Sequence, residues 1–177
     1  IDLAGSIGLD VYIPAPPDPR MKEFVPADQF AQMESGVSDR KRELEEYFES
    51  AKRYGELRAV GQADVTDVKL EAMQPYIKGL KPVLFHADSA GAIRLALATA
   101  KKFGLKGIIV GGAEAWQVTK QLKESNTPVI LKAPTAACPD ETDPSDELDP
   151  YDTPFVLPTL LHDAGVRFCY MTESFDT

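Results

Sequence analysis

The chain has 177 residues, of which 44% are hydrophobic and 27% are charged. This length is enough for one domain with a hydrophobic core, or for a piece of a larger domain. The net charge of −9, from 28 acidic against 19 basic residues, argues against a surface for nucleic acids or anionic membranes, and no apolar run reaches the roughly 18 residues of a membrane span.

The first 37 residues contain many prolines and little periodicity, so we expect residues 1–37 to be an irregular segment or an insertion. The chain begins at Ile1, without an initiator methionine, and we interpret it as a fragment. From residue 38 onward, the apolar residues recur at regular spacing. One helix is predicted to begin at Ser38 and stop at Gly55, and a second to cover residues 67–78.

Residues 38–177 form a region of repeated strand and helix units. The alternation predicts parallel strands joined by right-handed crossovers, and therefore an α/β fold. Four strands are compatible with half of an eight-stranded barrel or with a small doubly wound sheet. The predicted strands are 83–85, 107–110, 129–131 and 166–171, and the helices between them are 89–103, 113–125 and 158–164.

Chemistry-bearing residues gather directly after the first of these strands. His86 and Asp88 lie at its carboxyl end, where α/β folds hold ligands and metals, and Ser89 is placed to cap the next helix. The alternative for His86 is a structural histidine bonded to a neighbouring backbone group. Gly111 and Gly112 could let backbone amides approach a phosphate, although a tight turn explains this pair equally well.

Two further features leave their meaning open. Residues 140–152 carry many carboxylates and no basic residue, which is typical of a solvated loop and could also favour cationic substrates. Cys138 and Cys169 do not form a disulfide scaffold and suit a reducing compartment equally well. The sequence does not decide the cellular compartment, and we favour a soluble cytoplasmic protein.

Runs of residues between about 66 and 175 resemble the carboxyl-terminal half of amidohydrolases of the imidazolonepropionase-like group. That resemblance implies part of a (β/α)8 (TIM) barrel of amidohydrolase type, with metal ligands at the strand ends. The matching runs are 80–87, 92–98, 102–107, 112–115, 127–130, 151–154 and 160–168.

The resemblance also implies an activity, which is metal-dependent hydrolysis of a C–N bond in a small molecule. The substrate would be a cyclic amide, an acyl amino acid or a peptide, and the divalent metal, zinc first, would activate water. His86 matches a metal ligand, and Glu173 falls roughly where the family has a catalytic aspartate. Asp88 could assist as a ligand or base. The family's next histidine falls at Gly111.

Because a catalytic zinc site needs about three protein ligands, we expect the isolated chain to be inactive and to bind metal incompletely or not at all. Two alternatives remain. The first is a non-catalytic pseudoenzyme or structural module. The second is a rhodanese-like domain, suggested by the run 110–116, in which His86 takes the place of the catalytic cysteine. A partial barrel exposes strand edges, which we expect residues 1–37 or a second copy of the chain to cover.

Overall fold

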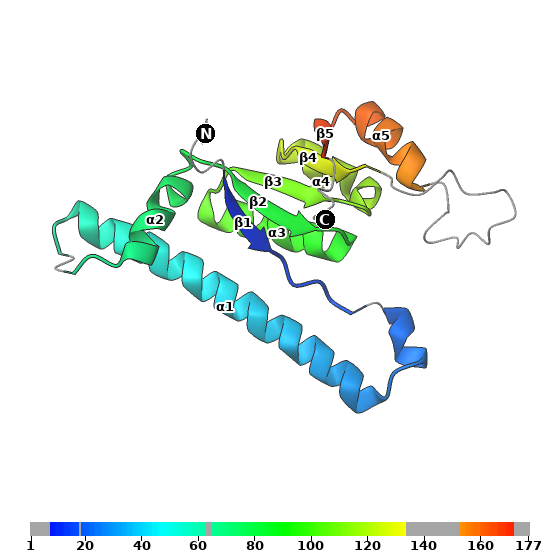
Figure 1. The fold of residues 1–177 in the computed structure, drawn as a ribbon, viewed down its shortest axis with the longest axis horizontal. Helices are drawn as coiled ribbons and strands as arrows, with labels where there is room; N and C mark the ends of the chain where they lie inside the picture. The colour runs from blue at the N-terminus through cyan, green and yellow to red at the C-terminus, as the bar shows by residue number, and fades with distance from the viewer. Residues whose placement is uncertain (1–7, 18, 63–64, 134–152, 172–177) are drawn as a thin grey trace, which may run out of the picture.

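The chain folds into a parallel sheet whose five strands follow one another in sequence order, β1-β2-β3-β4-β5 (Figure 1). The computed structural model describes residues 8–17, 19–62, 65–133 and 153–171. Every neighbouring pair of strands is parallel, as the sequence predicts. The strands are β1 (Leu9–Tyr12), β2 (Val83–Ala87), β3 (Gly107–Gly111), β4 (Val129–Lys132) and β5 (Phe168–Met171).

Helices connect the strands and pack with them into one hydrophobic core. The long helix α1 runs obliquely past the sheet, with α2 at its far end (Figure 1). The α-helices are α1 (Ala27–Ala59), α2 (Val68–Ile77), α3 (Ala90–Phe103), α4 (Thr119–Glu124) and α5 (Thr153–Asp163), and the 3₁₀ turns are η1 (Pro19–Glu23) and η2 (Ala115–Val118).

The two faces of the sheet differ. Alternate strand residues such as Val83, Phe85 and Ile109 are fully buried and belong to the helix-covered core. Their neighbours Leu84 and Ile108 point to the other face and do not belong to that core. A doubly wound sheet reverses its strand order and carries helices on both faces. Within the described residues, the sequential strand order and the single helix-covered face are those of a segment of a (β/α) barrel.

The segment expected to be irregular contains a strand. β1 lies within residues 1–37 and pairs with β2, with Leu9 opposite Val83 and Tyr12 opposite His86. The prediction that residues 1–37 cover an edge of the sheet is confirmed for the edge of β2. Residues 1–37 are therefore not irregular over their whole length. The prolines lie in the connection that follows β1, as expected because Pro cannot donate to a sheet ladder.

Helix α1 is longer than predicted at both ends. It begins at Ala27, directly after Pro26, and continues through Gly55 to Ala59. Gly55 does not stop the helix. It lies instead at the place where α1 meets Gln74 of α2. The other differences are smaller. The predicted helix 113–125 is divided into η2 and α4, and α5 begins at Thr153 rather than at residue 158.

An ion-paired lysine joins α3 to α1. Lys102 Nζ lies 2.7 Å from Glu45 Oε2 and 2.9 Å from Glu49 Oε1. The hydrogen bond to Glu45, followed by that to Glu49, raises the pKa of Lys102. The hydrogen bond from Lys102 lowers the pKa of Glu45. Both ends of the Lys102–Glu45 pair are thus stabilised in their charged forms in the folded chain.

We expect Lys102→Met to lower the melting temperature by no more than about 3 °C at neutral pH, since exposed ion pairs stabilise weakly. The difference in melting temperature between wild type and Lys102→Met should shrink as the pH falls through the lowered pKa of Glu45. It should also shrink as the pH rises through the raised pKa of Lys102. Thermal unfolding across pH measures this, with Lys101→Met as the control. A difference that does not change with pH would contradict the electrostatic account.

None of the helices in the described residues has the length and apolar character needed to cross a membrane.

Candidate functional site

His86 is the fourth residue of β2, near the carboxyl end of that strand. The register places it between Tyr12 of β1 and Val110 of β3. Val83, Phe85 and Ala87 of the same strand point into the helix-covered core, so strand alternation directs His86 to the uncovered face. In a closed barrel this face would line the interior. The structure therefore places His86 at the edge of the sheet that the sequence predicts.

Two residues of β1 hold the His86 ring. His86 Nε2 lies 2.8 Å from Asp10 Oδ1, and the Tyr12 ring stacks on the imidazole with centroids 4.3 Å apart and planes 11° apart. Neither residue was predicted to belong to the site. The alternation of apolar Leu9, Val11 and Ile13 with Asp10 and Tyr12 is a strand signal that could have revealed them.

Asp88 lies one residue beyond β2 and is exposed. Its carboxylate is directed at the backbone of Gly111, where a side chain would collide with it. Asp88 and His86 form no hydrogen bond or ion pair with each other. Asp88 is therefore close to His86 in the chain, but its carboxylate packs against the next strand–helix connection. Its predicted role as a ligand or base stays a proposal.

The loop after β3 is tied to the loop after β2. Gly112 N donates to Ala87 O (3.0 Å), and Glu114 N donates to Asp88 O (2.9 Å). The Glu114 carboxylate accepts a hydrogen bond from Ala90 N (2.7 Å) at the start of α3. An internal carboxylate thus occupies the place that a phosphate would take at this helix N-terminus.

The predicted cap is confirmed, because Ser89 Oγ accepts from Ala92 N at 3.2 Å. The glycine pair belongs to a tight turn, since Gly111 and Gly112 both have positive φ angles. Phosphate binding at this turn stays a prediction, because positive φ angles also suit a turn whose backbone amides bind an anion.

The described residues do not complete a metal centre. Within residues 8–17, 19–62, 65–133 and 153–171, no group of three or more His, Cys, Asp or Glu side chains could hold a metal ion. Val110, which has no ligating atom, lies beside His86 on β3. Glu173 and the acidic run 140–152 lie outside the described residues. A zinc ion needs about three protein ligands, so the donors in the described part of the chain do not fit it.

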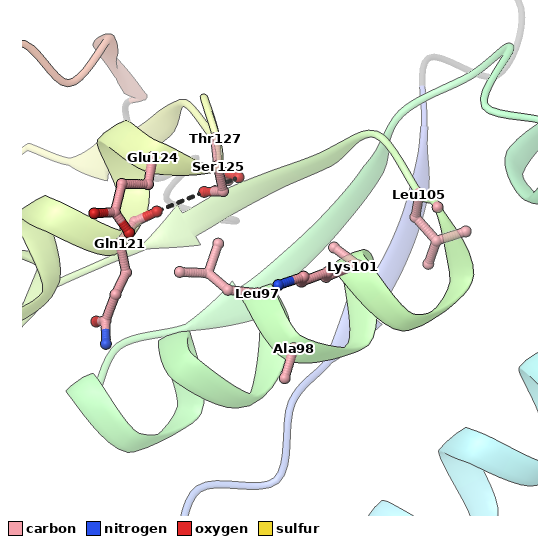
Figure 2. A pocket seen from close by; sticks show the side chains of 10 residues that line it. Leu97, Ala98, Lys101, Leu105, Gln121, Glu124, Ser125 and Thr127 are labelled. Atoms are coloured by element: carbon pink, nitrogen blue, oxygen red, sulfur yellow. Dashed lines mark hydrogen bonds between the residues drawn. The ribbon is translucent and has the colours of Figure 1, made fainter.

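A groove of about 630 Å³ lies between α3 and α4. Figure 2 shows its lining, where Leu97 and Lys101 of α3 face Gln121 and Glu124 of α4. Gly104, Leu105, Ser125 and Thr127, which precede β3 and β4, also line it. The groove therefore opens near the amino ends of the strands, at the edge opposite to His86.

A solved structure shows which fold this arrangement represents. An amidohydrolase from Thermotoga maritima MSB8 superposes on 93% of this chain with a TM-score of 0.66 and 24% sequence identity. The chain has an amidohydrolase-like fold. It spans 41% of the length of the Thermotoga protein, consistent with part of a TIM barrel. No family model matches the chain, and no curated protein matches it.

The candidate site is built around a single imidazole on the face of the sheet that no described helix covers. The barrel-type face carries one imidazole, and its hydrogen-bond partner is a carboxylate on the preceding strand. His162, the other histidine, lies on α5 with a side chain 82% exposed, as expected for a surface residue. The described part of the chain therefore offers His86 as the candidate for chemistry at the carboxyl edge.

Proposed function

We propose that this chain is part of a hydrolase that cleaves a C–N bond in a small molecule, with His86 as its central reactive side chain. The substrate classes are cyclic amides, acyl amino acids and peptides. The observation that carries the proposal is the position of His86 at the carboxyl edge of an amidohydrolase-like sheet, on the face that no described helix covers.

Hydrolysis of an amide needs a group that accepts a proton from water and later donates one to the leaving nitrogen. An imidazole can do both near neutral pH, and His86 is the imidazole at this edge. Its side chain is 26% exposed, so it is held by the fold and still accessible to a ligand. Asp88, which follows β2, is the further acid–base candidate in this connection.

A divalent ion, zinc first, remains a proposal for the complete site. His86 would supply one ligand, and further ligands would have to come from residues outside the described ranges, with Glu173 as a candidate. Such an ion would supply an activated water when bound. Because the described donors do not complete the site, the roles assigned to His86 and its neighbours here do not depend on the ion.

Chromogenic amides test the proposed hydrolysis. The count of zinc ligands predicts that the isolated chain is inactive. Acid–base catalysis by His86 predicts instead that it slowly releases p-nitroaniline from p-nitroanilides of acyl amino acids, and that His86→Ala reduces this rate at least about 100-fold. His162→Ala is the matched control and should retain the rate. Each assay is run with and without added zinc, and elemental analysis of the same preparations reports bound metal.

A non-catalytic module is the second candidate, and Val110 favours it because an apolar residue stands beside His86 where a further ligand could lie. In that case neither wild type nor the variants would release p-nitroaniline. A second copy of the chain is the proposed partner for the outer edges of β1 and β5, which pair with no further strand in the described residues. Size-exclusion chromatography that gives only monomer would contradict this.

A further inference from the structure

We infer that Asp10 is the residue that positions His86, by keeping the ring proton on Nε2 and leaving Nδ1 unprotonated as the acceptor for the reaction. The inference deepens the proposed function and rests on it for its catalytic meaning. Its structural content, a fixed tautomer and ring orientation, can be tested without any substrate.

The contact between the two side chains is short and is set by the sheet. His86 Nε2 and Asp10 Oδ1 are 2.8 Å apart, within the range of charge-assisted hydrogen bonds. Tyr12 is the register partner of His86, and Asp10 is two residues before Tyr12 on the same face of β1. Backbone pairing brings the carboxylate to the imidazole, so the contact does not depend on a loop.

Stacking by Tyr12 restricts how the imidazole can turn. The two rings are nearly parallel, with planes 11° apart and centroids 4.3 Å apart. A flip of the His86 ring would keep this stacking but would remove Nε2 from Asp10. The hydrogen bond therefore selects the orientation of the ring, and Tyr12 keeps its plane.

The other neighbours of His86 do not compete with Asp10. Val110, its register partner on β3, is 4% exposed and has no side-chain donor or acceptor. Gly111, which follows it, has no side chain. In the described part of the chain, Asp10 is thus the hydrogen-bond partner of the His86 ring.

A carboxylate can only accept, so the hydrogen bond with Asp10 requires a proton on Nε2. In the neutral ring Nδ1 is then the acceptor. During hydrolysis, the water oxygen would bond to the carbonyl carbon while its proton passes to Nδ1 and the C=O electron pair moves to oxygen. The pair then re-forms C=O, the C–N bond breaks, and the leaving nitrogen takes the proton from Nδ1. Amide and water thus give acid and amine.

Asp10 would act in the same way on a ligand held at Nδ1. Metal-binding histidines commonly donate their other ring N–H to a carboxylate, which fixes the tautomer. The positioning role is therefore the same whether Nδ1 accepts a proton or binds an ion, and the described residues do not need to form a complete metal centre for it.

Nitrogen NMR of chain labelled with 15N-histidine tests the tautomer directly. In wild type we expect the neutral His86 ring to carry its proton on Nε2. Asp10→Asn should move the proton toward Nδ1, because the asparagine amide can donate to Nε2. Asp39→Asn, an exposed change on α1, is the control for charge, and His162 gives an internal reference. A proton on Nδ1 in wild type, or no change in Asp10→Asn, would overturn the inference.

Kinetics separate this inference from the proposed function. With a p-nitroanilide, we expect Asp10→Asn to lower kcat about 10–100-fold with little change in KM, the range for a partner that orients a ligating or catalytic histidine. Asp10→Glu should restore part of the rate. If wild type shows no hydrolysis, the proposed function fails while the NMR result still decides the role of Asp10. Hydrolysis that is equal in wild type and Asp10→Asn would overturn the positioning role alone.

Discussion

Replacing Gly55 with alanine is expected to lower the free energy of unfolding by about 1–3 kcal/mol, although alanine is the better helix former. Gly55 lies inside α1, and an added Cβ would overlap Oε1 of Gln74 on α2. Gln74 is only 7% exposed, and its Nε2 donates to Ala51 O and Leu70 O, both at 2.9 Å. The amide cannot move away without losing these bonds, so the two helices would have to separate.

Gly36→Ala is the matched control, because Gly36 lies in the same helix and, apart from the backbone of that helix, nothing lies within 4 Å of the position its Cβ would take. That substitution should stabilise the chain by up to about 1 kcal/mol. Urea unfolding followed by circular dichroism measures both variants. If Gly55→Ala proved as stabilising as Gly36→Ala, the close approach of α1 and α2 would be wrong. The double variant Gly55→Ala with Gln74→Ala should recover part of the loss.

Replacing Gly111 with alanine is expected to cost about 2–3 kcal/mol and to disturb the site. Gly111 ends β3 with φ of +100°, where a residue with a side chain is strained by about 1–3 kcal/mol. The new Cβ would also overlap Asp88 Oδ1. Because Asp88 is exposed, its carboxylate can turn away. The overlap should therefore lower the free energy of unfolding by less than the backbone strain does.

Gly104→Ala separates the two contributions. Gly104 has φ of +67° at the end of α3, and apart from its chain neighbours nothing lies within 4 Å of its Cβ position, so only backbone strain of about 1–2 kcal/mol is expected. Urea unfolding compares the stabilities of the two variants. Adding Asp88→Ala to Gly111→Ala should recover only the part of the lost free energy of unfolding that comes from the overlap. If Asp88→Ala recovered none of the stability lost in Gly111→Ala, Asp88 would not press against Gly111.

The sequence predicted the repeated units of the fold well, because their signals are local. Apolar runs such as Val83–Phe85 form strands, Ser89 caps α3, and Gly104 ends it in a left-handed conformation. β1 escaped prediction because it is short and adjoins a proline-rich segment. Its pairing with β2 crosses more than 70 residues of chain, and no local pattern shows that distant contact.

The predictions for the candidate site also succeeded where the signal was local and failed where it was not. His86 was predicted from its place after an apolar run, and the structure confirms its position at the carboxyl edge of the sheet. Asp88 was expected beside it, since it is only two residues away. The structure instead directs that carboxylate at Gly111 and brings Asp10 to the imidazole. Proximity in the chain was a poor guide here because side-chain direction at a strand end depends on the neighbouring loop.

By itself, the sequence determined the α/β class, the parallel strands and the histidine at a strand end, because side-chain periodicity and helix caps act within a few residues. Only the tertiary structure decided that the sheet is a barrel segment with one face that no described helix covers, and that Asp10 and Tyr12 hold His86. The physical reason is that strand register joins residues far apart in the chain, and the chemistry of an imidazole depends on which atoms register places beside it.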